Sequence, residues 1–323
     1  MRGARRWFTL GILALGTATF LYLLWSFGPA LVWERLRAFG WGFAVVIPFQ
    51  IFDHMLNAMG WRLAFTASEA KKVSFWELVR VRVGGDGVNY LTPSGNIAGE
   101  FVRPGMLRSA LSHDSKVASV VVAKATQSVG QALFVLVGLI YLLNARVYAF
   151  KDGQAGWAAA GMSVILFGVA LLVGLMAARP PEWLRARFPA AVEKTEPLRR
   201  SLRDFLGRHP LRLIGSIFFF MLGYAWGAAE IWLICQFLGF PLSAEIALCV
   251  EFLSNVVDSF AFMVPAKIGT QEAGKTAIFK GLGMAADVGF TVGLIRHARE
   301  IIWAGLGLGM YAAQQRALVK KPG

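Results

Sequence analysis

The sequence predicts an all-α, polytopic membrane protein with about six spans and two re-entrant hairpins in an inverted repeat. Its 323 residues are 56% hydrophobic and 16% charged, with a mean hydropathy of +0.55. A soluble domain is usually about a quarter charged. Several apolar runs are long and continuous, whereas a transmembrane barrel would show short alternating strands. Helices are therefore expected, since they satisfy their own backbone polar groups in lipid.

Six apolar segments are predicted to cross the bilayer. They cover approximately residues 7–25, 39–65, 117–143, 157–178, 213–237 and 288–311. The first follows three arginines but is too long for a signal peptide and precedes no small-residue cleavage site, so we expect it to be retained. Residues 71–82 form a basic segment that fits a helix at the membrane surface. Residues 84–107 are rich in Gly and Pro and are too polar to cross.

The net charge of +14 is explained by membrane orientation. Basic residues concentrate at the N-terminus, in 71–82, in the link 179–210 and in the tail, and such segments face the cytoplasm. We therefore expect a bacterial-type inner membrane protein with both termini cytoplasmic and no nucleic-acid partner. Residues 244–264 are apolar enough to cross, but a single crossing would move the basic tail outside. A hairpin is favoured there, although the sequence leaves both arrangements open.

A self-match indicates an internal repeat. The first copy contains Asp86, Pro93, Glu100, Arg103 and Arg108, and the second contains Asp258, Pro265, Glu272, Lys275 and Lys280. Each pair is separated by 172 residues (258 − 86), and the same offset aligns Lys124 with Arg296. The alternative is coincidence in a chain rich in Gly, Pro, Lys and Arg.

The repeat predicts a single transmembrane domain over residues 1–323. Its halves, about 39–178 and 211–314, are joined by the basic cytoplasmic link 179–210. The second span enters the first copy travelling inward and the fifth enters the second copy travelling outward, so the halves are related by an axis in the membrane plane. Inverted repeats with Gly- and Pro-interrupted helices are typical of alternating-access carriers.

Charged residues inside the apolar runs are candidate site residues, because ionisable groups in lipid are costly and usually face a cavity. Lys124 has no acid within one helical turn, which favours a distant partner or an anionic ligand. Glu300 lies one turn from Arg296 and is as readily explained by an ion pair. Glu100 with Arg103, and Glu272 with Lys275, stand three residues apart and are predicted to neutralise each other.

No motif of a metalloprotease, a serine-hydrolase elbow or a phosphate-binding loop occurs, and the four histidines have no metal-ligand spacing. We therefore expect no catalytic residue, no metal and no cofactor. An acid/base pair made of Glu100 and Glu272 keeps an enzyme open as an alternative.

Two blocks resemble a known family. Gly87-Val-Asn-Tyr-Leu-Thr-Pro93, followed by Gly99-Glu-Phe-Val-Arg103 and Leu107, resembles the N-x3-P…GE-x2-R…L block of the lysylphosphatidylglycerol synthase transmembrane, or flippase-like, family. Pro265-Ala-Lys-Ile-Gly269-Thr-Gln-Glu272 is similar to its P-x-x-x-G-x-x-E block, which often reads P-G-G where this chain has Ala266 and Lys267. The resemblance covers nearly the whole chain.

The resemblance implies a membrane domain that transfers lipids between leaflets. In the best-known members this domain precedes a soluble aminoacyl-transferase, which does not follow the last predicted span here, so we do not expect the synthase activity. Stand-alone members associated with hopanoid lipid or cell-envelope pathways are the nearer comparison.

The predicted function is translocation of an anionic lipid or lipid-linked amphiphile between leaflets. The predicted substrate-binding residues are Asn89, Pro93, Glu100, Arg103, Lys124, Glu272, Lys275 and Arg296. The alternatives are a membrane-embedded lipid-modifying transferase and an accessory subunit that presents lipid to an envelope enzyme. Purified protein that consumes a lipid and a donor would indicate the transferase, and a phenotype that depends on a partner would indicate the accessory role. The partner is a membrane lipid with an anionic head group, and the oligomeric state stays open.

Overall fold

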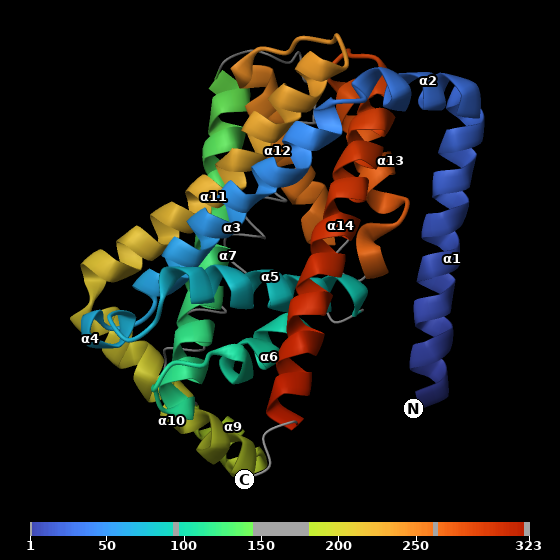
Figure 1. Ribbon diagram of the computed structural model, residues 1–323. Helices are drawn as coiled ribbons and strands as arrows, with labels where there is room; N and C mark the ends of the chain where they lie inside the picture. The colour runs from blue at the N-terminus through green and yellow to red at the C-terminus, as the bar shows by residue number, and fades with distance from the viewer. Residues whose placement is uncertain (1, 93–96, 145–180, 261–263, 320–323) are drawn as a thin grey trace. The chain divides into compact units, whose positions relative to one another are not determined.

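The computed structural model describes residues 2–92, 97–144, 181–260 and 264–319, and every element in these ranges is a helix (Figure 1). The all-helical prediction is therefore confirmed for this part of the chain. Contacts divide the protein into two compact units. Unit 1 comprises Met1–His54, Arg80–Met106 and Tyr224–Gly323, and unit 2 comprises Met55–Val79 and Leu107–Gly223.

The helices follow one another along the chain. The first seven are α1 (Arg2–Phe27), α2 (Pro29–Phe39), α3 (Gly42–Leu63), α4 (Ala67–Ala70), α5 (Phe75–Leu91), α6 (Ala98–Met106) and α7 (His113–Asn144). The others are α9 (Glu182–Arg187), α10 (Pro189–Arg208), α11 (Pro210–Phe237), α12 (Ala244–Phe260), the 3-10 turn η1 (Pro265–Lys267), α13 (Thr270–Gly281) and α14 (Ala286–Val319).

Two described helices are long and apolar enough to cross a membrane, namely α7 over His113–Leu142 and α11. A third span results if Ala14–Phe27 and Pro29–Phe39, which meet at 89°, count as one bent segment. The predicted number of six spans is not confirmed. The predicted span at 157–178 lies outside the described residues, and the 34-residue α14 carries Arg296, Arg299 and Glu300 within its apolar stretch.

A short helix, α2, lies between the first two predicted spans. Gly28, with φ 85°, ends α1, and Pro29 starts α2 at the helix position where its missing N–H costs nothing. Arg35 of α2 forms an ion pair with Asp287 of α14, and its guanidinium carbon lies 4.7 Å from the centre of the Phe240 ring. Arg35 therefore anchors α2 to α14 within unit 1.

Helix α5 continues through the first glycines of the segment that was predicted to be too polar to cross. These glycines allow close contact between α5 and α14. A Cβ on Gly87 would lie 2.7 Å from the carbonyl oxygen of Ala304, and a Cβ on Gly307 would lie 2.2 Å from that of Val83. Small residues let helix backbones approach in this way in membrane proteins. The glycines of α5 therefore serve the packing of α5 against α14.

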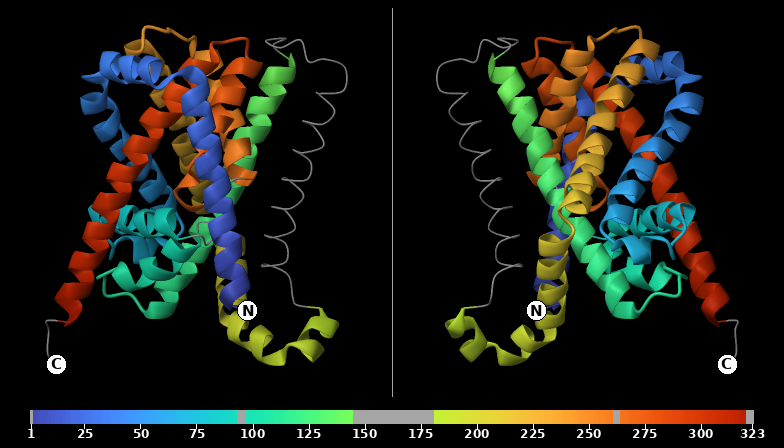
Figure 2. Two further views of the ribbon diagram at one scale, coloured as in Figure 1. Left: turned by 90° about the vertical axis from the view of Figure 1, so that its right-hand side faces the viewer. Right: turned by 90° about the vertical axis from the view of Figure 1, so that its left-hand side faces the viewer.

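Two helical hairpins occupy the places of the predicted repeat. The first is α5 with α6, and the second is α12 with η1 and α13. Helix α13 begins at Thr270, 172 residues after Ala98 of α6 (270 − 98), and α14 begins 173 residues after α7 (286 − 113). Both views in Figure 2 show α13 beside α12 and α14, in agreement with their contacts. The inverted relation of the two halves stays a prediction.

Unit 2 is held by polar contacts between the end of α3, α7 and α11. Trp61 donates to the Ser119 hydroxyl at 3.2 Å, and Ser216 donates to the carbonyl oxygen of Gly60 at 2.8 Å. Arg212 of α11 donates to the carbonyl oxygens of Arg62 and Phe65 at the end of α3. A cation in this position satisfies carbonyls that have no partner within the helix.

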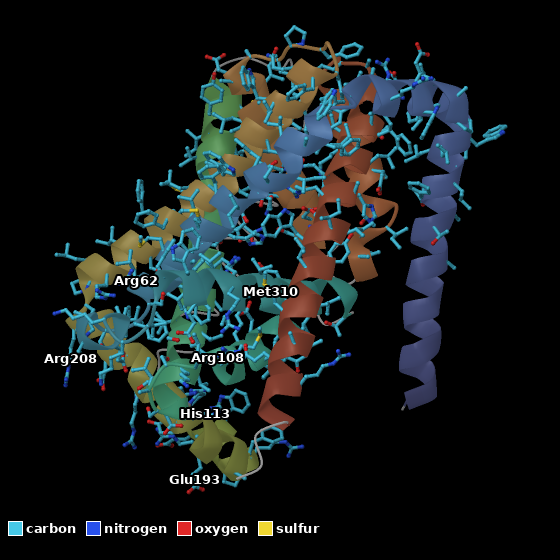
Figure 3. All side chains as sticks on the ribbon, viewed as in Figure 1. Arg62, Arg108, His113, Glu193, Arg208 and Met310 are labelled. Atoms are coloured by element: carbon cyan, nitrogen blue, oxygen red, sulfur yellow. The ribbon has the colours of Figure 1, made fainter. Side chains whose placement is uncertain are left out.

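Basic residues gather on one side of unit 2. Figure 3 shows Arg62, Arg108 and Arg208 on the side that carries α4 and α10. We call this the basic side of unit 2. On it, Thr66 and Glu69 form a capping box that starts α4.

The crossing of α5 and α14 yields a stability prediction. Gly307→Ala should lower the free energy of unfolding by about 1–3 kcal/mol, because the new methyl group would overlap backbone of α5. Gly305→Ala, on the same helix, is the matched control, since its Cβ meets nothing within 4 Å. Thermal unfolding in detergent compares the two variants. Equal midpoints for both would show that the α5–α14 contact is looser than described.

Candidate functional site

A network of charged side chains runs through the interior of unit 1. Its basic members are Arg82, Arg103, Lys267, Lys275, Arg296 and Arg299, and its acidic members are Asp86, Glu100, Glu230, Glu251, Asp258, Glu272 and Glu300. We call these residues the charge network. They come from η1 and from α5, α6, α11, α12, α13 and α14. Taking ions out of water costs several kcal/mol each, so their partners decide what each can do.

Arg296 of α14 has its donors occupied by the protein itself. Its Nε lies 2.9 Å from Glu230 Oε2 of α11, and its Nη1 lies 2.7 Å from Glu251 Oε2 of α12. Its Nη2 donates to the carbonyl oxygen of Gly227 at 3.3 Å. A Cβ on Gly227 would lie 2.2 Å from Glu251 Oε1, so this position has room only for glycine. Arg296, predicted to contact a lipid head group, therefore holds two carboxylates within unit 1.

Glu300 pairs with Arg299 and Lys267 and not with Arg296, the partner that the sequence suggested. Arg299 lies 3.4 Å from Glu300 Oε1 and also donates to Glu230. Lys267 Nζ lies 3.8 Å from the same Glu300 oxygen. No ion pair between Glu300 and Arg296 occurs among the described residues.

Glu272 organises the second hairpin. Its Oε2 accepts the backbone N–H of Gly269 at 3.0 Å, which caps the start of α13. Its Oε1 lies 2.5 Å from Nδ1 of His297 on α14, and the Glu272 side chain is fully buried. The predicted pair between Glu272 and Lys275 is not found in the described part of the chain, because His297 takes the carboxylate.

Lys275 is the exception in the charge network. The residue is 2% exposed, yet no ion pair or hydrogen bond of its ammonium group is found in the part of the chain that the structure describes. The charges that act on it most are those of Arg296, Asp258, Glu251 and Glu300. Each of these three acids has another cation within 4 Å. Asp258 and Glu300 both lie near Lys267, and Glu251 shares Arg296 with Glu230. Lys275 thus has a buried amino group for which no carboxylate of the described residues lies within 4 Å.

The first hairpin is closed by its own ion pairs. Arg103 donates to Glu100, as the spacing predicts, and to Asp86 at 2.6 Å. Asn89 accepts the backbone N–H of Gly99 at 2.6 Å, which fixes the start of α6 against α5. Three of the predicted site residues, Asn89, Glu100 and Arg103, therefore lie together and shape this hairpin.

The remaining predicted site residues are Lys124 and Pro93. Lys124 belongs to unit 2 and is partly buried on α7. Pro93 lies outside the described residues. Within those residues, no group of three or more His, Cys, Asp or Glu side chains is placed to hold a metal ion.

Sequence reasoning missed His297 and Lys267 as site residues. His297 stands between charged residues in an apolar helix, which is a signal of an interior position, but its partner Glu272 lies 25 residues away. The one sequence signal at Lys267 was that it replaces a glycine common in the P-x-x-x-G-x-x-E block of the family.

A comparison with known families decides the membership of this chain. The family model described as Lysylphosphatidylglycerol synthase TM region matches residues 9–309. The chain belongs to this family. No curated protein and no solved structure matches it.

Membership confirms the resemblance drawn from the two sequence blocks, and with the apolar helices it establishes a multi-pass membrane protein. It also gives the chain a membrane role related to lipids. The charge network is therefore the interior of a lipid-related membrane domain, where ionisable side chains usually mark a functional path or pair with one another.

The pairing of Arg296 leads to a second stability prediction. Arg296→Ala should destabilise the protein by about 3–5 kcal/mol, because it leaves Glu230 and Glu251 buried with one cation fewer. Arg316→Ala, at an exposed position of the same helix, is the control and should be neutral. Thermal unfolding in detergent measures both.

A compensating variant sharpens this test. Glu230→Gln together with Glu251→Gln removes the two stranded charges, so adding both changes to Arg296→Ala should recover much of the lost stability. An Arg296→Ala protein as stable as the parent would show that the three groups do not depend on one another.

Proposed function

We propose that this protein moves an anionic lipid or lipid-linked amphiphile between the leaflets of its membrane, and that Lys275 contacts the anionic group. The observation that carries the proposal is the buried ammonium of Lys275, which has no ion pair among the described residues. The lipid-related family supports the nature of the ligand.

The argument rests on the cost of buried charge. An ionised side chain inside a membrane protein is expensive unless an opposite charge compensates it. Arg103 and Arg296 have carboxylates within 3 Å, so their charges are accounted for by structure. Lys275 lacks this compensation, and a phosphate or another lipid anion would supply it. Lysine binds phosphate as a compact point charge.

The hairpins support movement of the ligand as well as binding. Each consists of a helix, a break and a second helix, and such discontinuous segments surround the substrate in carriers built from inverted repeats. An inverted repeat allows two alternative arrangements of the halves around one site, which is what exchange between leaflets needs.

The same proposal includes an orientation. We place both termini in the cytoplasm of a bacterial-type inner membrane, with the basic side of unit 2 facing inward. Arg62, Arg108 and Arg208 on that side support it, because Lys and Arg near span ends remain on the cytoplasmic side.

Lipid movement provides the functional prediction. Lys275→Ala should slow the movement of a fluorescent phosphatidylglycerol across reconstituted vesicles to near the rate of protein-free vesicles, because the anionic group loses its counter-charge. The melting temperature should stay equal or rise, since an uncompensated buried cation is removed. Quenching of the outer-leaflet fluorophore follows the movement.

Lys280→Ala is the matched control, because Lys280 is an exposed lysine on the same helix. It should move lipid like the parent protein. Lys275→Ala that moves lipid at the parent rate, or that melts far below the parent, would refute the role given to Lys275.

The orientation is tested with reporter fusions. A reporter that is active only in the cytoplasm, fused after Gly323, should be active, and one active only outside the membrane should be silent. The opposite result would mean an odd number of crossings and would exclude the six-span arrangement.

A further inference from the structure

The two hairpins treat their equivalent basic residue differently. In the first, Arg103 is held by both Asp86 and Glu100. The residues 172 positions later are Lys275, Asp258 and Glu272. In the second hairpin both acids contact other basic side chains, Asp258 with Lys267 at 3.3 Å and Glu272 with His297 at 2.5 Å.

The two competing residues have no basic counterpart in the first copy. The residue 172 positions before Lys267 is Gly95, and the one before His297 is Ala125. The second copy therefore keeps the acids and the basic residue of the first but pairs each acid with a different base. Asp86 of the first copy also lies 3.5 Å from Arg82 and 3.6 Å from His54, but it keeps its pair with Arg103. Lys275 is left without a partner in consequence.

From this difference we infer that Lys267 is a positioning residue that keeps Lys275 available for the anionic group of the lipid, by binding Asp258. This inference rests on the proposed function of Lys275. Lys267 acts through Asp258 and also lies 3.8 Å from Glu300, so it engages two of the acids whose charges reach Lys275.

The backbone at Lys267 supports a role for its side chain. Ala266 and Lys267 have φ values of 52° and 53°, in the left-handed region that favours glycine. A non-glycine residue held there is strained, and such strain concentrates at functional positions. Glycine, which stands at the equivalent position of the first copy, would remove the strain. A lysine in this conformation indicates that its ammonium group is needed.

Removal of Lys267 would change the balance around Lys275. Asp258 would lose the partner within 4 Å that the structure gives it, and Lys275 is a remaining cation on which its charge already acts. The freed carboxylate would then compete with the lipid anion for the same ammonium group. The second hairpin would come to resemble the first, whose Arg103 is held by the protein itself.

The experiment uses the full chain in vesicles that contain fluorescent phosphatidylglycerol. Lys267→Gly should slow lipid movement about tenfold without lowering the melting temperature, since glycine suits the backbone at this position. Asp258→Asn alone is measured as the reference for the double variant. The double variant, Lys267→Gly with Asp258→Asn, should move lipid at the rate of Asp258→Asn alone and faster than Lys267→Gly, because the competing carboxylate is gone. A purely structural role for the Lys267–Asp258 pair predicts no recovery.

Lys267→Asn serves as a second variant if the glycine protein does not fold, because asparagine tolerates a positive φ. Parent-like movement by Lys267→Gly, or no recovery in the double variant, would overturn the inference. Lys275→Ala, measured in parallel, separates the two claims. If it moves lipid at the parent rate, the proposed function itself fails, whereas a defect in Lys275→Ala with none in Lys267→Gly rejects only the role of Lys267.

Discussion

The ion pairs of Arg296 with Glu230 and Glu251 hold the interior of unit 1 together. One guanidinium on α14 contacts a carboxylate on α11 and another on α12, and Arg299 one turn further donates to the same Glu230. Lipid tails are as apolar as leucine, so apolar side chains alone give helices little reason to associate in a bilayer. The ion pairs of Arg296 therefore fix which faces of the three helices are in contact. Gly227 has no side chain and leaves room for this contact.

The second hairpin depends on this arrangement. Helix α14 carries His297 and Glu300 beside Arg296 and Arg299, so the residues that hold α13 and η1 are placed by the same stretch of helix. His297 binds the carboxylate that caps α13, and Glu300 accepts from Gln271 at 3.2 Å. A rotation of α14 that broke the Arg296 pairs would also withdraw these contacts. The face of α14 that carries these residues therefore determines both the position of the second hairpin and the partners left for Lys275.

Local features of the sequence predicted the helical membrane class and part of the site. Long apolar runs gave the helices, and the three-residue spacing of Glu100 and Arg103 gave a pair that the structure contains. The same spacing failed for Glu272 and Lys275, because the competing His297 is brought in by tertiary structure. The packing role of the glycines of α5 could not be predicted for a similar reason, since their partner Gly307 lies more than 200 residues away along the chain (307 − 87). Spacing along one helix reveals possible pairs, but the choice among several partners depends on contacts between helices.

The contrast between the hairpins bears on how a repeat becomes a binding site. Two copies with identical pairing would each neutralise their own basic residue, and neither would offer a charge to a ligand. Pairing each acid of one copy with a different base leaves its lysine without an ion pair among the described residues. It also makes the lysine sensitive to its surroundings, since any change that releases Asp258 or Glu272 restores a competitor within the protein. If Lys275 binds the lipid anion as proposed, its affinity is set by residues that never touch the ligand, and Lys267 is then as informative a position to change as Lys275.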